Sequence, residues 1–504
     1  MTRPLSAFYP LLLALAALSC SVPEWQYADR RTSFNQLRIY QIMVEAYADG
    51  DSTRGYGSGW GPSDHLGDLR GITDQVPQIA ALGVNAILLT PIFDSDRHAD
   101  ADDRLDATGY FARDYFRIDP EFGSLQDARE LVDTAHAHGL YVFLDGVFGH
   151  HKADVVPSPT GRLPAGPDNP VDYPGSLDFY TEVALYWIDV LNIDGWRLDQ
   201  AYQVPPGMWR QIRGAVEEHS RQRARSGHAW GTLGYMVAEV WRSDKEIARD
   251  AYGPPLSPAL LSAFDFPMRY RLVQTLAVEE SGRGEMPASN LAAGYETHAS
   301  YPPHAVPTFM LSNHDLVRFG DLIERAGFGG PDTEQYWARL RCAHSFLAAY
   351  TGPITLYYGE ETGDEMAGFD ARVEDECWKV FLCDDHVGRT SGRFSELAPE
   401  AAELRQYVAS LMRARARHSS LWNGARQSLV ADETLFVDLK VDGRDRVLYL
   451  LNTGANSRRV VFPLTELGAR QFSDAVSQAP VAVNGDSLVI DMDGLSARFV
   501  ALTD

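Results

Sequence analysis

The chain alternates short apolar runs with longer stretches of helical periodicity over most of its length. Eight runs have the composition of buried strands: 38–47, 84–92, 140–147, 194–199, 235–241, 261–267, 307–315 and 353–361. Between and after them, apolar residues recur every three or four positions, which is typical of amphipathic helices. These segments are 67–83, 124–139, 176–192, 206–225, 334–350 and 398–416.

This alternation predicts a parallel α/β sheet, and eight strands favour closure into a (β/α)8 TIM barrel over residues 36–416. The alternative is an open, doubly wound sheet, which usually carries a glycine-rich GxGxxG turn after its first strand. No turn of that form follows residues 38–47, so we favour the barrel.

Two insertions and a change of pattern complete the predicted organisation. Residues 94–123 are rich in Asp and Arg, and residues 149–175 are dense in Pro and Gly, which predicts a short inserted subdomain after the third strand. Both insertions follow strands and therefore belong to the carboxyl-end face, where barrel enzymes build their sites. Residues 424–504 switch to short alternating strands, so we predict a C-terminal all-β sandwich.

Residues 1–20 have the pattern of a secretory signal peptide. The apolar run LLLALAAL at 11–18 follows Arg3 and is shorter than the roughly 20 apolar residues that span a bilayer. The sequence ALSC at 17–20 is similar to a bacterial lipoprotein processing site. We expect an exported protein that is either anchored in the cell envelope through lipidated Cys20, its only expected membrane attachment, or released to the periplasm or medium.

Three cysteines remain besides Cys20. Cys377 and Cys383 are close enough in sequence to pair across a short loop. Cys342 lies in a helical pattern, so we expect it to be a buried apolar side chain.

The composition of the chain limits the classes of ligand and partner that we expect it to bind. The 504 residues carry 45 Lys+Arg and 69 Asp+Glu, a formal net charge of −24. Such a surface repels phosphate backbones and anionic lipid, so we expect neither nucleic-acid binding nor polybasic docking to membranes. The 10 Trp, 23 Tyr and 22 Phe suit stacking on flat, neutral ligands such as sugar rings, although aromatic residues also fill cores.

Acidic residues stand at the carboxyl ends of four predicted strands: Asp145, Asp199, Glu239 and Asp315. Barrel closure would bring these ends around one mouth, where carboxylates repel each other and one stays protonated near neutrality while another is ionised. A retaining glycosidase needs this arrangement, with one carboxylate attacking the anomeric carbon and one carboxylic acid protonating the departing oxygen. A single Asp at a strand end is weak evidence, because such residues usually cap helices.

The surroundings of these acids resemble the four signature segments of the α-amylase superfamily, glycoside hydrolase family 13. The segments are DGVFGH at 145–150, GWRLD at 195–199, Glu239 at the end of its strand, and NHD at 313–315. Residues 83–91, 109–127 and 352–361 also resemble motifs of the family. The resemblance covers about residues 36–416, and the family usually places a β module after the barrel.

The resemblance implies a role for each acid. Asp199 would be the nucleophile that forms a covalent β-glycosyl-enzyme, and Glu239 would be the general acid and then the base. Asp315 would bind ring hydroxyls most tightly in the transition state. Arg197, two residues before Asp199 on the same strand face, would hold the Asp199 carboxylate ionised and complete the substrate-binding site.

The resemblance also implies residues that bind or support the substrate. Tyr110 would stack beneath the sugar, and His150 and His314 would donate hydrogen bonds to its hydroxyls. Asp145 and Arg318 would support these groups from behind.

One departure from the family pattern concerns calcium. Gly149 stands where many members have an Asn whose amide oxygen helps to bind a structural calcium ion. Asp49, Asp51 and Asp68 resemble a different calcium loop found after the first strand in some relatives, and oxygen ligands suit Ca²⁺. The alternative is a solvated polar turn.

A second departure concerns the acceptor side of the cleft. Tyr202 and Gln203 replace a Lys-His pair that ordinary α-amylases often carry at these positions. The leading hypothesis is a retaining hydrolase of α-glucosidic bonds in malto-oligosaccharides or related α-glucans. The alternative is a transglycosylase or isomerase acting on maltose or sucrose through the same ester. A non-catalytic glycan binder would be expected to have lost one of the three acids.

Overall fold

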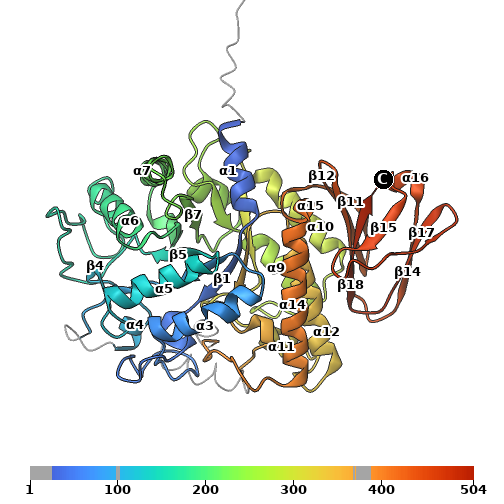
Figure 1. Ribbon diagram of the computed structural model, residues 1–504, viewed down its shortest axis with the longest axis horizontal. Helices are drawn as coiled ribbons and strands as arrows, with labels where there is room; N and C mark the ends of the chain where they lie inside the picture. Colours follow the sequence, from blue (N-terminus) through green and yellow to red (C-terminus); the bar gives the residue numbers. More distant parts are fainter. Residues whose placement is uncertain (1–24, 98–102, 367–368, 370–387, 504) are drawn as a thin grey trace, which may run out of the picture.

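Eight parallel strands close into a barrel in the computed structural model, which describes residues 25–97, 103–366, 369 and 388–503 (Figure 1). The strands are β1 (Arg38–Ile42), β2 (Ala86–Leu89), β5 (Tyr141–Gly146), β6 (Gly195–Leu198), β7 (Tyr235–Ala238), β8 (Ser262–Phe264), β9 (Val306–Met310) and β10 (Ile354–Tyr357). β10 pairs with β1 and closes the ring, with Tyr40 opposite Leu356. Each of the eight predicted strands is present, and the TIM-barrel prediction is confirmed.

The strands are apolar throughout because both of their faces are buried. In β2, Leu88 belongs to a cluster that also contains Phe143 and Val237 and fills the inside of the barrel. The alternate residue Ile87 belongs instead to the larger core between the strands and the helices. This explains why the sequence shows continuous apolar runs rather than the alternation of a half-exposed sheet.

Helices surround the barrel and separate successive strands (Figure 1). They are α1 (Trp25–Asn35), α2 (Val44–Tyr47), α3 (Leu69–Ala81), α4 (Asp103–Ala107), α5 (Leu125–Ala137), α6 (Leu177–Leu191), α7 (Pro206–Arg225), α8 (Asp244–Ile247), α9 (Phe266–Leu276), α10 (Ser289–Glu296), α11 (Phe319–Arg325), α12 (Glu334–Ala349), α14 (Pro399–Arg417) and α15 (Ser419–Asn423). The six predicted helices correspond to α3, α5, α6, α7, α12 and α14. Local chemistry sets their ends: Ser124 and Asp127 form a capping box that begins α5.

The two insertions differ in structure. In the first, β3 (Phe93–Asp94) and β4 (Asp114–Ile118) pair antiparallel and hold the loop that carries α4. The segment 149–175 contains neither helix nor strand. It is tied to the end of β5 by hydrogen bonds from the Val171 backbone N–H to the Gly149 carbonyl, at 2.9 Å, and from Tyr173 to the Phe148 carbonyl, at 2.9 Å.

Two antiparallel sheets follow the barrel, beside α12 and α14 in Figure 1. One has the order β11 (Ala425–Ala431), β12 (Leu435–Asp442), β13 (Asp445–Asn452), β18 (Ser496–Thr503) and β15 (Gln471–Asp474); the other has the order β14 (Arg458–Pro463), β17 (Ser487–Met492) and β16 (Val483–Asn484). Val437 and Leu448 from the first sheet share a core with Phe462 and Ile490 from the second. The predicted all-β sandwich is therefore confirmed.

Cys342 is buried in α12, as predicted. Cys20, Cys377 and Cys383 lie outside the described residues, as do the signal and processing segments at 1–20. Within the described ranges, the helices are too short or too polar to cross a membrane.

Arg415 joins α14 to the end of α12. Its side chain is fully buried, and Nη1 donates hydrogen bonds to the carbonyls of Ala348, at 2.9 Å, and Tyr350, at 2.6 Å. These carbonyls end α12, so one guanidinium satisfies several backbone acceptors that water cannot reach.

We expect Arg415→Met to destabilise the protein by about 3 kcal/mol, because it leaves buried carbonyls without donors. The midpoint of thermal unfolding measures this loss. Arg413→Met, at an exposed position on the same helix, is the matched control. Equal midpoints for the two variants would contradict the role assigned to Arg415.

Candidate active site

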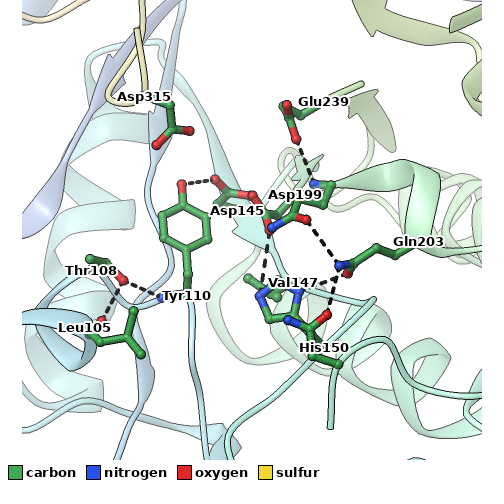
Figure 2. Close-up of polar contacts among 12 residues, drawn as sticks. Leu105, Thr108, Tyr110, Asp145, Val147, His150, Asp199, Gln203, Glu239 and Asp315 are labelled. Atoms are coloured by element: carbon green, nitrogen blue, oxygen red, sulfur yellow. Dashed lines mark hydrogen bonds and ion pairs between the residues drawn. The ribbon is translucent and has the colours of Figure 1, made fainter. Parts of the chain in front are cut away.

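One pocket of about 450 Å³ holds the three predicted catalytic acids, Asp199, Glu239 and Asp315. Asp199 follows β6, Glu239 follows β7, and Asp315 lies in the loop after β9. Figure 2 shows their carboxyl groups around a common space, with Tyr110 and His150 below. Barrel closure thus brings together residues that are far apart in the chain.

Arg197 is the centre of the acidic cluster. It is fully buried on β6, and its Nη1 donates hydrogen bonds to Asp199 Oδ1 at 2.8 Å and to Asp145 Oδ2 at 2.7 Å. Burial acts to lower the pKa of Arg197, but Asp145 and the neighbouring carboxylates outweigh it and raise that pKa well above its usual value. The guanidinium therefore stays charged and fixes the orientation of both carboxylates.

The second oxygen of Asp199 is left available. Asp199 Oδ2 is buried and has no hydrogen-bond partner among the described residues. His150 Nε2 lies 4.0 Å from this oxygen. A carboxylate in the pocket lining with one oxygen anchored and the other without a partner is arranged as a nucleophile requires.

Glu239 has a different environment from Asp199. Its Oε2 accepts a hydrogen bond from the backbone N–H of Gln200 at 2.8 Å and lies 4.0 Å from Arg197 Nη2. Burial raises the pKa of Glu239 to about 7, an effect that Arg197 opposes and the charge of Asp199 reinforces. Glu239 can therefore both give and take a proton near neutrality.

Tyr110 lines the pocket, and Asp145 and His314 hold its hydroxyl group. The Tyr110 hydroxyl donates a hydrogen bond to Asp145 Oδ2 at 2.7 Å and lies 2.7 Å from His314 Nε2. The rings of Tyr110 and His314 are stacked, with their centroids 5.3 Å apart. Burial raises the pKa of Asp145 and lowers that of His314, so the imidazole is neutral at neutral pH.

Arg389 is a site residue that the sequence analysis missed. It is fully buried in the pocket wall, its Nη2 lies 3.2 Å from Asp315 Oδ1, and its Nε donates a hydrogen bond to the His314 carbonyl at 3.0 Å. Its Nη1 is buried without a partner among the described residues. No strand, helix or acidic motif marked this residue, which stands in a loop after the last barrel strand.

Arg318 bonds to backbone carbonyls of two loops beside the site. Its Nε donates a hydrogen bond to the Gly388 carbonyl at 2.8 Å, and its Nη1 donates one to the Tyr358 carbonyl at 2.9 Å. The side chain therefore holds the backbone next to Arg389.

The predicted calcium ligands have other partners. The Asp68 carboxylate accepts hydrogen bonds from the backbone N–H groups of Gly71, in the first turn of α3, and of Gly50 and Asp51. Asp51 in turn binds Thr53 and Arg54. In the described part of the chain, no group of three or more His, Cys, Asp or Glu side chains is placed to hold a metal ion. Asp51 and Asp68 are thus engaged by groups of the protein itself, and calcium at Asp49, Asp51 and Asp68 stays an untested prediction.

Aromatic residues form the wall that adjoins Glu239. The Tyr202 ring is partly exposed, and the Arg242 guanidinium lies 4.1 Å from its centroid. Trp241 donates a hydrogen bond through Nε1 to the Tyr270 hydroxyl at 2.7 Å and stacks on Phe266. A second pocket, of about 590 Å³, shares Trp241 and Arg242 with the first.

A barrel with acids gathered at the carboxyl ends of its strands provides the paired carboxyl groups that a glycoside hydrolase needs. A family model, described as "Alpha amylase, catalytic domain", matches residues 41–157 and 177–448. The chain belongs to the α-amylase superfamily, glycoside hydrolase family 13, and is an enzyme of that family. The match omits residues 158–176, and all of these except 176 lie in the predicted insertion at 149–175.

Named relatives agree with this assignment. Neopullulanase 2 of Thermoactinomyces vulgaris is 27% identical, over 91% of this chain and 74% of its own length. A cyclomaltodextrinase of Geobacillus thermopakistaniensis is 26% identical, over 85% of this chain and 71% of its own. A crystal structure of AmyP in complex with maltose has 48% identity and a TM-score of 0.90, covering 94% of this chain and 97% of that one.

The raised pKa of Glu239 predicts the pH dependence of activity. Because the acid form is lost as pH rises through about 7, kcat/KM for maltotriose should fall on the alkaline side with a midpoint near pH 7. Glu239→Gln should abolish this reaction but retain cleavage of α-maltosyl fluoride, whose leaving group needs no proton. An alkaline limb that persists for the fluoride in Glu239→Gln would assign the titration to another group.

Proposed function

We propose that this enzyme hydrolyses α-glucosidic bonds in malto-oligosaccharides or related α-glucans with retention of configuration, through a covalent β-glycosyl ester on Asp199. One observation carries the proposal. In a single pocket, Asp199 has one oxygen anchored by Arg197 and one oxygen without a partner among the described residues, while Glu239 holds a proton up to about pH 7.

The first half-reaction follows from these positions. Asp199 Oδ2 attacks the anomeric carbon, and Glu239 donates its proton to the glycosidic oxygen as the carbon–oxygen bond breaks. The leaving chain departs as an alcohol, and Glu239 is left ionised. The products of this step are a neutral ester and a carboxylate, so charge and atoms balance.

The second half-reaction reverses the roles. Ionised Glu239 takes a proton from water, the oxygen of that water bonds to the anomeric carbon, and the ester bond to Asp199 breaks. Two displacements at one carbon restore its original configuration. A pKa near 7 suits Glu239 to both steps, because neither protonation state is strongly disfavoured.

Asp315 and its neighbours would bind the sugar at which reaction occurs. Arg389 and His314 lie on either side of the Asp315 carboxylate, at 3.2 Å and 3.1 Å. These contacts limit the rotation of Asp315, so hydrogen bonds to ring hydroxyls can strengthen as the ring flattens without a cost of reorganisation. The Tyr110 ring, fixed by Asp145, offers a flat face to the same sugar.

The activities named for the relatives support an α-glucan as substrate. They include a neopullulanase and a cyclomaltodextrinase, and solved structures of AmyP hold maltose and maltotriose.

Transfer of the glycosyl group to a sugar is the second candidate. The wall of Tyr202, Arg242 and Trp241 leads from Glu239 to the second pocket, where a sugar hydroxyl could replace water in the second half-reaction. Chromatography of the products from maltotriose separates the two, because only transfer makes chains longer than the substrate.

We further propose that residues 1–20 direct export and that Cys20 anchors the enzyme in the cell envelope. The support is the apolar run at 11–18 after Arg3 and the processing-site pattern at 17–20.

We expect Asp199→Asn to lower turnover of maltotriose by a factor on the order of 1,000 or more, since the nucleophile is lost, while the thermal midpoint stays near that of the wild type. Asp133→Asn, on the exposed face of α5, is the control for loss of one carboxylate. Mass spectrometry of Glu239→Gln with α-maltosyl fluoride should detect the ester on Asp199. Activity of Asp199→Asn close to that of the control would eliminate the proposed mechanism.

Trp241 tests whether the leaving chain runs into the second pocket. We expect Trp241→Ala to raise KM for maltoheptaose about 10-fold and to change KM for maltotriose less, because stacking contacts with a longer chain are lost. Trp230→Ala, which removes an indole that stacks on His136, is the control. Equal effects on the two substrates would place the longer chain elsewhere.

A further inference from the structure

We propose that Gln203 is a positioning residue that fixes the tautomer of His150, so that this ring accepts a hydrogen bond from the substrate instead of donating one. Gly149 makes the room for it. The inference rests on the proposed function in that the pocket must bind an α-glucan, and it assigns a task to two residues that depart from the family pattern.

The amide of Gln203 has a determined orientation. Gln203 ends the short helix η1 (Ala201–Gln203) that follows Asp199, and Figure 2 shows it beside His150. Its Nε2 donates hydrogen bonds to Asn169 Oδ1 at 3.1 Å and to Gln200 Oε1 at 3.2 Å. Because two acceptors face the nitrogen, the oxygen of the amide points to His150.

This orientation decides where His150 carries its proton. Gln203 Oε1 lies 3.0 Å from His150 Nδ1, and a carbonyl oxygen can only accept a hydrogen bond. In the neutral form of the ring, Nδ1 therefore bears the proton and Nε2 carries a lone pair. The resemblance had implied that His150 donates a hydrogen bond to the substrate.

The tautomer has a consequence for the nucleophile. His150 Nε2 lies 4.0 Å from Asp199 Oδ2, the oxygen that has no partner among the described residues. A proton on Nε2 would turn a positive partial charge toward that oxygen, at a separation longer than a hydrogen bond, and would make it a weaker nucleophile. A lone pair on His150 Nε2 does not engage Asp199 Oδ2. It accepts a hydrogen bond from a sugar hydroxyl next to this oxygen.

Gly149 is required for this contact. A Cβ atom at position 149 would lie 2.2 Å from Gln203 Oε1 and 2.6 Å from Gln203 Cβ. Contacts this short force the two groups apart, so any side chain at 149 would expel the amide from its place. The contact between Gln203 and His150 therefore requires a glycine at position 149.

Nuclear magnetic resonance of the full chain with ¹⁵N-labelled histidine tests the tautomer directly. His150→Gln identifies the signals of His150 among the 14 histidines. The wild type should show a protonated Nδ1 and an unprotonated Nε2 for His150. Gln203→Met, which keeps the length of the side chain and removes the amide, should abolish this preference, and Gly149→Ala should do the same. A protonated Nε2 in the wild type, or an unchanged ring in Gln203→Met, would overturn the inference.

Kinetics then show whether the tautomer matters for catalysis. We expect Gln203→Met to lower kcat/KM for maltotriose about 10-fold, because one hydrogen bond is lost. The thermal midpoint should not change. Gln203→Glu keeps an acceptor at this position and should restore the protonated Nδ1 signal. Gln211→Met, an exposed change on α7, is the matched control and should leave kcat/KM unchanged. Unchanged kcat/KM in Gln203→Met would overturn the functional part of the inference.

The two proposals fail in different ways. A wild-type enzyme that cleaves no α-glucan but shows the expected His150 signals would refute the proposed function and keep the assigned tautomer. An active wild type with a protonated Nε2 would refute only the tautomer.

Discussion

A single buried guanidinium makes the active site of this enzyme possible. Asp145, Asp199 and Glu239 are all removed from water, and carboxylates in that position are costly unless a positive group compensates them. Arg197 bonds directly to the first two and lies 4.0 Å from the third. Because Arg197 bonds to Asp199 but not to Glu239, the Asp199 carboxylate is anchored, whereas the pKa of Glu239 rises to about 7.

The backbone around Arg197 holds this arrangement rigidly. The N–H of Asp199 donates a hydrogen bond to the Gly146 carbonyl at 3.1 Å, and that of Glu239 donates one to the Leu198 carbonyl at 2.9 Å, so β5, β6 and β7 continue their pairing to the acids themselves. Gln200 then adopts a left-handed conformation, with φ of 39°, and aims its N–H at Glu239. The chain is strained at the position where it must turn from Asp199 toward Glu239.

The walls of the pocket come from less regular parts of the chain. Arg389, Gln203 and Tyr202 lie in loops or in one short helical turn, and each is positioned by partners distant in sequence. The barrel strands thus carry the acids, and the segments that follow the strands supply the wall of the pocket.

The sequence by itself determined the barrel, its main helices, the sandwich and the residues that carry the acids. Local periodicity encodes these features, since a strand buried on both faces is apolar throughout and a surface helix repeats every three or four residues. That signal is weak in parts of the sandwich, because β11 is largely exposed and β15 and β16 are short. Only the tertiary structure decided the role of Arg389, the partners of Arg318 and Asp68 and the contact between Gln203 and His150. These contacts depend on which loops, distant in sequence, lie together in the fold. A local pattern of polar and apolar residues does not predict such contacts.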